Sequence, residues 1–162
     1  MPLWHRYDND RQKGSIQQAD ADTPNGRGNL QVDNGLISAV ELSLFTHRRA
    51  PEGTPLPGAA DDTRGWWGDR FWRADFERPD YQIGSLIWLL YRDKITQQTM
   101  QRLKDYAEDA VAWMVQDGII ERATAVVTRE SNDLLSFTLS VKRPDETAPL
   151  WIGPWEVTFS GV

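Results

Sequence analysis

The sequence predicts an α+β fold in which a short antiparallel sheet packs on two or three helices. Two stretches carry this prediction. Between residues 100 and 114 the apolar side chains recur every three or four positions, as they do along an amphipathic helix. Residues 135–141 then alternate apolar side chains with Ser and Thr, which is the pattern of a half-buried strand.

The first 32 residues predict a loose hairpin arm. Residues 3–7 and 14–18 have strand-like composition, and Asp8-Asn9-Asp10 between them favours a turn. Because a two-stranded piece is marginally stable alone, the arm must dock on something within this chain or beyond it. We therefore divide the chain into an arm, residues 1–32, and a single α+β domain, residues 33–162.

Three helices are expected in this domain. Residues 36–46 contain more apolar positions than one stripe needs, so we expect a helix buried on most sides. Residues 86–91 predict a short, very apolar helix. Thr96 stands where an N-cap is expected, and the long amphipathic helix that follows should run to Gly118, a natural helix stop.

Two further strands complete the predicted sheet. Residues 123–128 are the expected antiparallel partner of residues 135–141. Residues 155–160 alternate again, with Trp155, Val157 and Phe159 on one face. We expect this last strand at a sheet edge, where its backbone could extend a sheet in a neighbouring chain.

A long loop rich in tryptophan spans residues 50–82. Its first half carries Pro and Gly without periodicity, and Trp66, Trp67 and Trp72 follow within seven residues. The rings either fold back into the core of the domain, anchor a protein partner, or stack on sugar rings. The side chains that we expect at protein interfaces, in this loop and in the last strand, are Arg64, Trp66, Trp67, Asp69, Trp72, Trp155, Val157 and Phe159.

Composition argues against several classes of protein. The 162 residues include 18 basic and 24 acidic side chains, a net charge of −6, which disfavours nucleic acid as a partner. No apolar run is long enough for membrane insertion. Cysteine is absent and only two histidines occur, so we expect no metal, no cofactor and no catalytic site. Acidic neighbours such as Asp61-Asp62 could form a glycosidase pair, but acids in a loop of this kind are usually solvated, and we expect no enzyme.

Three blocks of the sequence together resemble a known family. The first is Asp33-Asn34-Gly35-Leu36, continuing to Ala50. The second is Arg64-Gly65-Trp66-Trp67-Gly68-Asp69. The third begins at Ile83-Gly84-Ser85 and continues to Asp117-Gly118. In combination they resemble the Mu-type phage tail baseplate protein family, over most of residues 29–145. That family is similar to the smaller, lysozyme-named wedge component of T-even phage baseplates.

The resemblance implies a structural protein in the baseplate of a contractile phage tail, a prophage or a tailocin particle. Its implied partners are other baseplate wedge subunits, central hub or spike proteins and the sheath protein, with assembly in the host cytoplasm. The smaller relatives carry Glu-Pro-Arg after the long helix, whereas this chain has Gln116-Asp117-Gly118, so no role is transferred for that tripeptide. A carbohydrate- or cell-surface-binding module that uses the Trp-rich loop remains the alternative.

Overall fold

The computed structural model describes residues 5–8, 13–16, 35–58, 62–66, 68–69, 82–144 and 146–161. The chain divides into two compact units, Met1–Glu41 and Leu42–Val162. In the first unit, strand β1 (His5–Asp8) pairs antiparallel with β2 (Lys13–Ile16). The chain passes from the first unit to the second within helix α1 (Leu36–Phe45). A docking role for the N-terminal arm stays a prediction.

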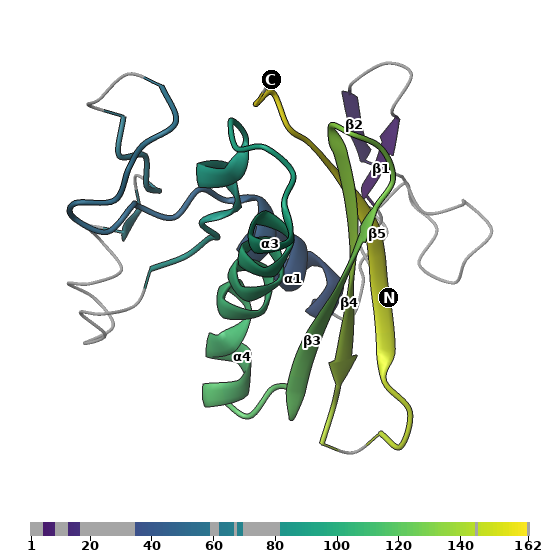
Figure 1. Cartoon of the computed structure of the whole chain (residues 1–162). Coiled ribbons are helices and arrows are strands. Elements are labelled where there is room, and N and C mark those ends of the chain that lie inside the picture. Colours follow the sequence, from purple (N-terminus) through teal and green to yellow (C-terminus); the bar gives the residue numbers. More distant parts are fainter. Residues whose placement is uncertain are drawn as a thin grey trace. The chain divides into compact units, whose positions relative to one another are not determined.

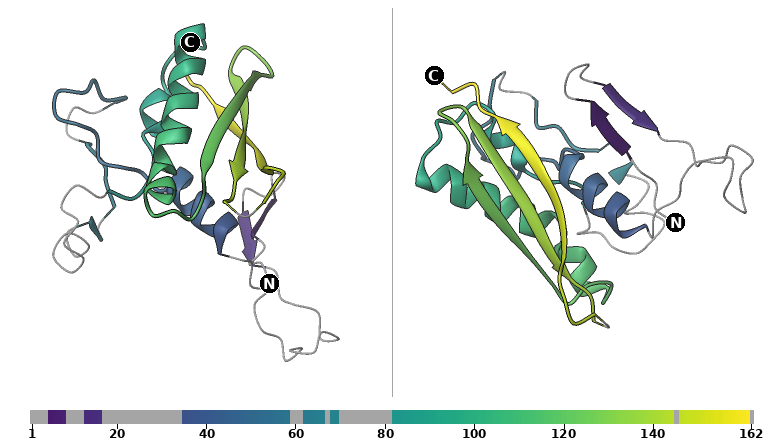
Figure 2. Two further views of the ribbon diagram at one scale, coloured as in Figure 1. Left: turned by 90° about the horizontal axis from the view of Figure 1, so that it is seen from below. Right: turned by 90° about the vertical axis from the view of Figure 1, so that its right-hand side faces the viewer.

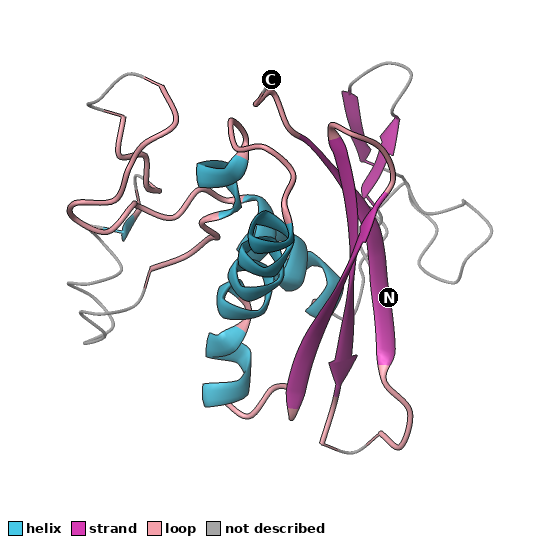
Figure 3. Ribbon diagram, viewed as in Figure 1, coloured by secondary structure: helices cyan, strands magenta, loops and turns pink. Residues whose placement is uncertain are grey.

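The second unit is built on a three-stranded antiparallel sheet, and the expected α+β fold is confirmed. The strands are β3 (Arg122–Arg129), β4 (Leu134–Lys142) and β5 (Leu150–Thr158), with β4 in the centre. Helix α3 (Gln97–Ala110) lies across one face of this sheet, as Figures 1 and 3 show. In the right-hand view of Figure 2, β5 and β3 form its two outer strands.

The long helix begins where the sequence predicts and is interrupted before its predicted end. The Thr96 side chain accepts a hydrogen bond from the Thr99 N–H at 3.1 Å, which is the expected N-cap. The predicted single helix is wrong beyond Ala110, because Val111 leaves helical geometry (φ −106°, ψ 4°). The short helix α4 (Ala112–Gln116) follows, and its Trp113 indole N–H donates to the Ser43 hydroxyl at 3.0 Å.

The core follows the alternation of β4. Its apolar side chains, at every second position, are buried, and so is the stripe of α3 that includes Leu103 and Ala107. β5 begins five residues earlier than the alternation indicates, at Leu150. The reason is a bulge, because Ile152 and Trp155 pair with Leu139 and Phe137 and leave two residues of β5 opposite one of β4. Gly153 and Pro154 occupy this bulge and interrupt the alternation.

Helix α1 is less buried than the sequence predicts, because two of its apolar side chains are exposed. Leu36, Val40 and Leu44 are buried at four-residue spacing, which makes one stripe. Leu42 and Phe45 are instead 59% and 48% exposed. The second apolar face of this helix is therefore open to solvent at its C-terminal end.

The short apolar segment forms the 3₁₀ helix η1 (Ile87–Leu90), all four of whose residues are buried. The residues that follow β5 are hydrogen-bonded to the segment that follows η1. Ser160 donates to the Tyr91 carbonyl through its backbone N–H at 2.7 Å and through its hydroxyl at 3.1 Å. A Cβ at Gly161 would lie 2.3 Å from the Arg92 carbonyl oxygen, so this close approach of two backbones requires glycine.

Candidate functional site

The Trp-rich loop leaves the domain and returns to it over a small backbone ladder. Residues 46–50 lie between two segments that are distant in sequence. On one side the Ser85 N–H donates to the Thr46 carbonyl at 2.9 Å, and the Arg48 N–H donates to the Ser85 carbonyl at 3.0 Å. On the other side the Ala50 N–H donates to the Thr63 carbonyl at 3.0 Å. The ladder therefore holds the outgoing limb of the loop, residues 46–50, next to the returning limb, residues 62–66. It also holds the outgoing limb next to Ser85, which lies just before η1.

Four side chains meet at this ladder, and we call the cluster of His47, Arg64, Trp88 and Tyr91 the loop root. The Arg64 guanidinium carbon lies 4.7 Å above the centre of the Trp88 ring. The His47 ring lies 6.0 Å from Trp88 and 6.5 Å from Tyr91, between ring centres. Trp88 is 1% exposed, and its indole N–H donates to the Arg48 carbonyl at 2.9 Å. The loop root thus stacks a cation on a ring that the core holds rigidly.

The backbone of Arg64 adopts φ +49°, which is uncommon for a residue with a side chain. The Asp62 carboxylate stabilises this turn by accepting from the Arg64 N–H at 3.1 Å and from its Nε at 3.2 Å. On its other side Arg64 places Nη1 3.1 Å from His47 Nδ1. Arg64 is therefore held from two sides over the Trp88 ring.

Burial and charge set the titration of the loop root. Burial, and then the neighbouring Arg64 cation, lower the pKa of His47 below its usual value, while Asp62 opposes them. Burial raises the pKa of the Tyr91 hydroxyl, and Arg64 opposes that shift. Both side chains therefore favour their neutral forms in the folded protein.

The remaining expected residues of the loop are only partly described. Trp66 is half-buried, and a Cβ at Gly68 would lie 2.2 Å from its ring, so this glycine allows the indole to lie against the backbone. The Asp69 N–H donates to the Trp66 carbonyl at 3.2 Å and closes a turn. Trp67 and Trp72 lie outside the described residues. The structure brings Arg64 together with His47 and Trp88, two residues that the sequence analysis did not select.

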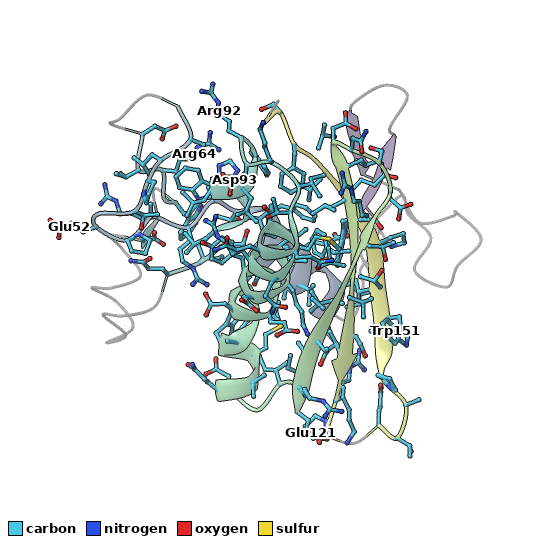
Figure 4. All side chains as sticks on the ribbon, viewed as in Figure 1. Glu52, Arg64, Arg92, Asp93, Glu121 and Trp151 are labelled. Carbon is cyan, nitrogen blue, oxygen red and sulfur yellow. The ribbon has the colours of Figure 1, made fainter. Side chains whose placement is uncertain are left out.

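The other expected interface is β5. Trp155 is half-buried between two rings, with its centre 5.3 Å from that of Phe137 and 5.8 Å from that of Phe45. Val157 and Phe159 are only 6% and 4% exposed. Their side chains belong to the domain's own core, so any partner of this stretch would meet mainly its backbone. Figure 4 shows Trp151, which the sequence analysis did not select, projecting from the face of β5 away from α3.

The two edges of the sheet differ in their backbone partners. On the β3 edge, the Ala125 N–H donates to the Glu108 carboxylate of α3 at 2.9 Å. On the β5 edge, Ser160 reaches the Tyr91 carbonyl, but residues 150–158 have no backbone hydrogen bond beyond β4 within the described part of the chain. One edge is thus partly occupied from within, whereas the described part of the chain adds no strand to the other.

The described ranges contain no cluster of three or more His, Cys, Asp or Glu side chains that could hold a metal ion. Among the described helices, none has the length and apolar character needed to cross a membrane.

Comparison with known proteins relates the chain to a phage family. The family model described as Phage protein GP46 matches residues 36–148. The chain belongs to the Phage protein GP46 family. The expected Mu-type phage baseplate family is thereby confirmed, and the matched residues include the loop root and the whole of α3, α4, β3 and β4.

Two named phage and prophage proteins are similar to this chain over most of its length. "Baseplate protein gp46" of Escherichia phage Mu is 34% identical over 147 residues, which cover 85% of this chain and 94% of the relative. "Mu-like prophage FluMu protein gp46" of Haemophilus influenzae is 28% identical over 120 residues, which cover 74% of this chain and 77% of the relative. The similarity therefore extends over most of both proteins.

Proposed function

We propose that this chain is a structural subunit of the baseplate of a contractile phage tail or tail-like particle. In this role it joins wedge subunits to the central hub and to the first sheath layer, and it works by binding rather than by catalysis. The observation that carries the proposal is the 34% identity to the Mu baseplate protein, which extends over 94% of that relative.

The asymmetry of the sheet supports this role physically. A strand with free backbone groups along one edge can accept a strand from another subunit. Glu108 occupies part of the opposite edge, so addition of a strand is favoured on one side only. An edge that accepts a single partner suits a subunit that occupies a defined place in an assembly.

The proposed interface also includes side chains. Leu42 and Phe45 are exposed at the end of α1, and Phe45 contacts Trp155 of β5. A strand added to β5 would lie next to Phe45 and bury its ring. Trp66 and Asp69 of the Trp-rich loop form the second part of the proposed interface. The sugar-binding alternative gains no support from Trp66, whose half-buried indole lies against Gly68.

The assembly role is tested by measuring the copy number of this chain in purified tail particles with quantitative mass spectrometry. A fixed copy number that is a multiple of three or six is expected for a symmetric baseplate. Absence from intact particles would refute the structural role. The particles are made in the host cytoplasm, so the same measurement on lysates before and after assembly follows incorporation.

The role of the free edge is tested by one substitution and its control. The Phe159 N–H points to the Asp133 carbonyl on the β4 side and the Ser160 N–H points away, so alternation turns the Glu156 N–H outward. Glu156→Pro removes that N–H and leaves the β4 ladder intact, and an edge strand tolerates proline. Glu156→Ala is the matched control that keeps the N–H. We expect Glu156→Pro alone to lower incorporation into tails; equal incorporation of two folded variants would exclude strand addition at this point.

A further inference from the structure

The contact between His47 and Arg64 joins two basic side chains. Arg64 Nη1 lies 3.1 Å from His47 Nδ1 and 3.5 Å from His47 Nε2. A guanidinium group has only donors, so either contact is a hydrogen bond only where the ring nitrogen accepts. His47 therefore favours its neutral form in this arrangement. A protonated imidazole would lose its acceptor and would place a second cation against Arg64.

The groups around His47 give little compensation for a positive charge. Arg64 and Asp62 reach it from the returning limb of the loop, and Trp88 and Tyr91 from η1 and the residue after it. Asp62 binds the Nε side of Arg64 and has a largely exposed carboxylate. On its own segment, Arg48 turns away to the Gly84 carbonyl and to Asp109. The charged side chain in direct contact with His47 is thus a cation.

We propose that His47 is a proton-sensitive latch of the loop root. Neutral His47 holds Arg64, and with it residues 62–66, against residues 46–50 and the Trp88 ring. Protonated His47 releases the returning limb of the loop. This inference is independent of the baseplate role.

The remaining links between the two limbs are few, which makes the latch effective. Among the described residues they are the hydrogen bond from the Ala50 N–H to the Thr63 carbonyl, a longer one of 3.4 Å from Arg49 to the Thr63 hydroxyl, and the packing of Gly65 on the Arg49 side chain. Each of them involves a residue next to His47 or Arg64, or two to three positions away. Loss of the central contact therefore weakens the whole returning limb.

The direction of the pH effect follows from the number of bound protons. The latched state has the lower pKa at His47, so the released state binds more protons at acidic pH. Latching is complete above the ordinary histidine pKa and weakens as the pH falls below it, until the pKa of the latched state is reached. Each unit between the two pKa values corresponds to about a tenfold loss in the latching equilibrium.

Amide hydrogen exchange of the full chain, measured by NMR between pH 7.5 and 5, tests the latch. The reporter is the Ala50 N–H, which spans the two limbs. The Glu121 N–H, which donates to the Lys142 carbonyl in the sheet, reports the stability of the whole domain. We expect the protection factor of Ala50 to fall several-fold at acidic pH relative to that of Glu121.

His47→Gln is the matched control, because it keeps a neutral acceptor at every pH. We expect the Ala50 protection of this variant to be constant relative to Glu121. His47→Lys, permanently cationic, should show low Ala50 protection already at pH 7.5. The proposal is overturned if wild-type Ala50 keeps its relative protection at pH 5, or if His47→Gln loses as much of it as the wild-type chain.

Discussion

The Glu108 carboxylate of α3 accepts a hydrogen bond from the Ala125 N–H, 2.9 Å away on the outer edge of β3. A helix side chain thus occupies a backbone donor that another strand would need. Lys104, 3.9 Å from the same carboxylate oxygen, leaves that oxygen accessible to the strand. Helix α3 both covers the sheet and closes part of one of its edges.

Glu108→Ala should destabilise the domain and free the β3 edge. It removes the acceptor of a partly buried N–H, which costs about 1–3 kcal/mol. Urea unfolding measures this loss. Glu108→Gln keeps an uncharged acceptor and should lose less. A loss from Glu108→Ala no larger than that of Glu108→Gln would mean that the hydrogen bond contributes little.

Gly84→Ala should weaken the ladder below the loop root. A Cβ at this position would lie 2.4 Å from the Thr46 carbonyl oxygen, and the backbone has φ +106°. Gly118→Ala is the control, because Gly118 has φ +71° but no atom within 4 Å of a Cβ. At Gly118, whose φ lies near the left-handed helical region, positive φ costs an alanine about 1–2 kcal/mol. Overpacking should add about 1–3 kcal/mol at Gly84 alone, and equal unfolding free energies for the two variants would contradict the close approach.

Thr96→Ala should remove the N-cap of α3. The Thr96 hydroxyl accepts from the Thr99 N–H and lies 3.0 Å from the Thr99 hydroxyl. Loss of such a cap costs about 1 kcal/mol of stability. Thr96→Ser retains the hydroxyl and should stay near the wild type in thermal unfolding. If Thr96→Ser is destabilised as much as Thr96→Ala, the methyl group rather than the cap is responsible.

Tyr91 should make the domain sensitive to alkaline pH. Its pKa is raised above the usual 10.0 by burial, so the folded state holds the phenol proton more tightly than the unfolded state. The contribution of neutral Tyr91 to the free energy of unfolding is complete below the unfolded-state pKa of its hydroxyl. It is lost as the pH rises through the folded-state pKa. Tyr91→Phe removes this group, and we expect its unfolding free energy to fall less than that of the wild type between pH 9 and 11. If the unfolding free energies of Tyr91→Phe and the wild type fall equally over this pH range, other residues cause the loss.

Sequence patterns predicted the elements that depend on local periodicity. The alternation of residues 135–141 and the cap at Thr96 are confirmed, because both result from side chains that are near neighbours in the chain. The first half of β5 was missed because Gly153 and Pro154 interrupt its alternation at a bulge, and a bulge depends on the partner strand. The break at Val111 leaves no trace in the spacing of apolar residues, which continues through it.

The candidate site was less predictable than the fold. Arg64 could be selected because it stands among tryptophans, but its partners His47, Trp88 and Tyr91 come from two other segments. Their meeting is a product of tertiary structure, and no local pattern at His47 indicates it. From the sequence alone, Glu108 is one of several acidic residues on the polar side of α3. Its contact with β3 is evident only in the folded structure.

The order of the strands also has a consequence in time. β5 follows β3 and β4 in the chain, so it leaves the ribosome after them, and it covers one side of the central strand β4. Until β5 emerges, β4 has only β3 as a partner, and a two-stranded sheet is marginally stable. The domain therefore completes its sheet only after β5 has emerged, and the outer edge of β5 comes into existence in the same step. A nascent chain whose β5 is still inside the ribosome lacks that edge, which delays recruitment of this subunit until β5 has emerged.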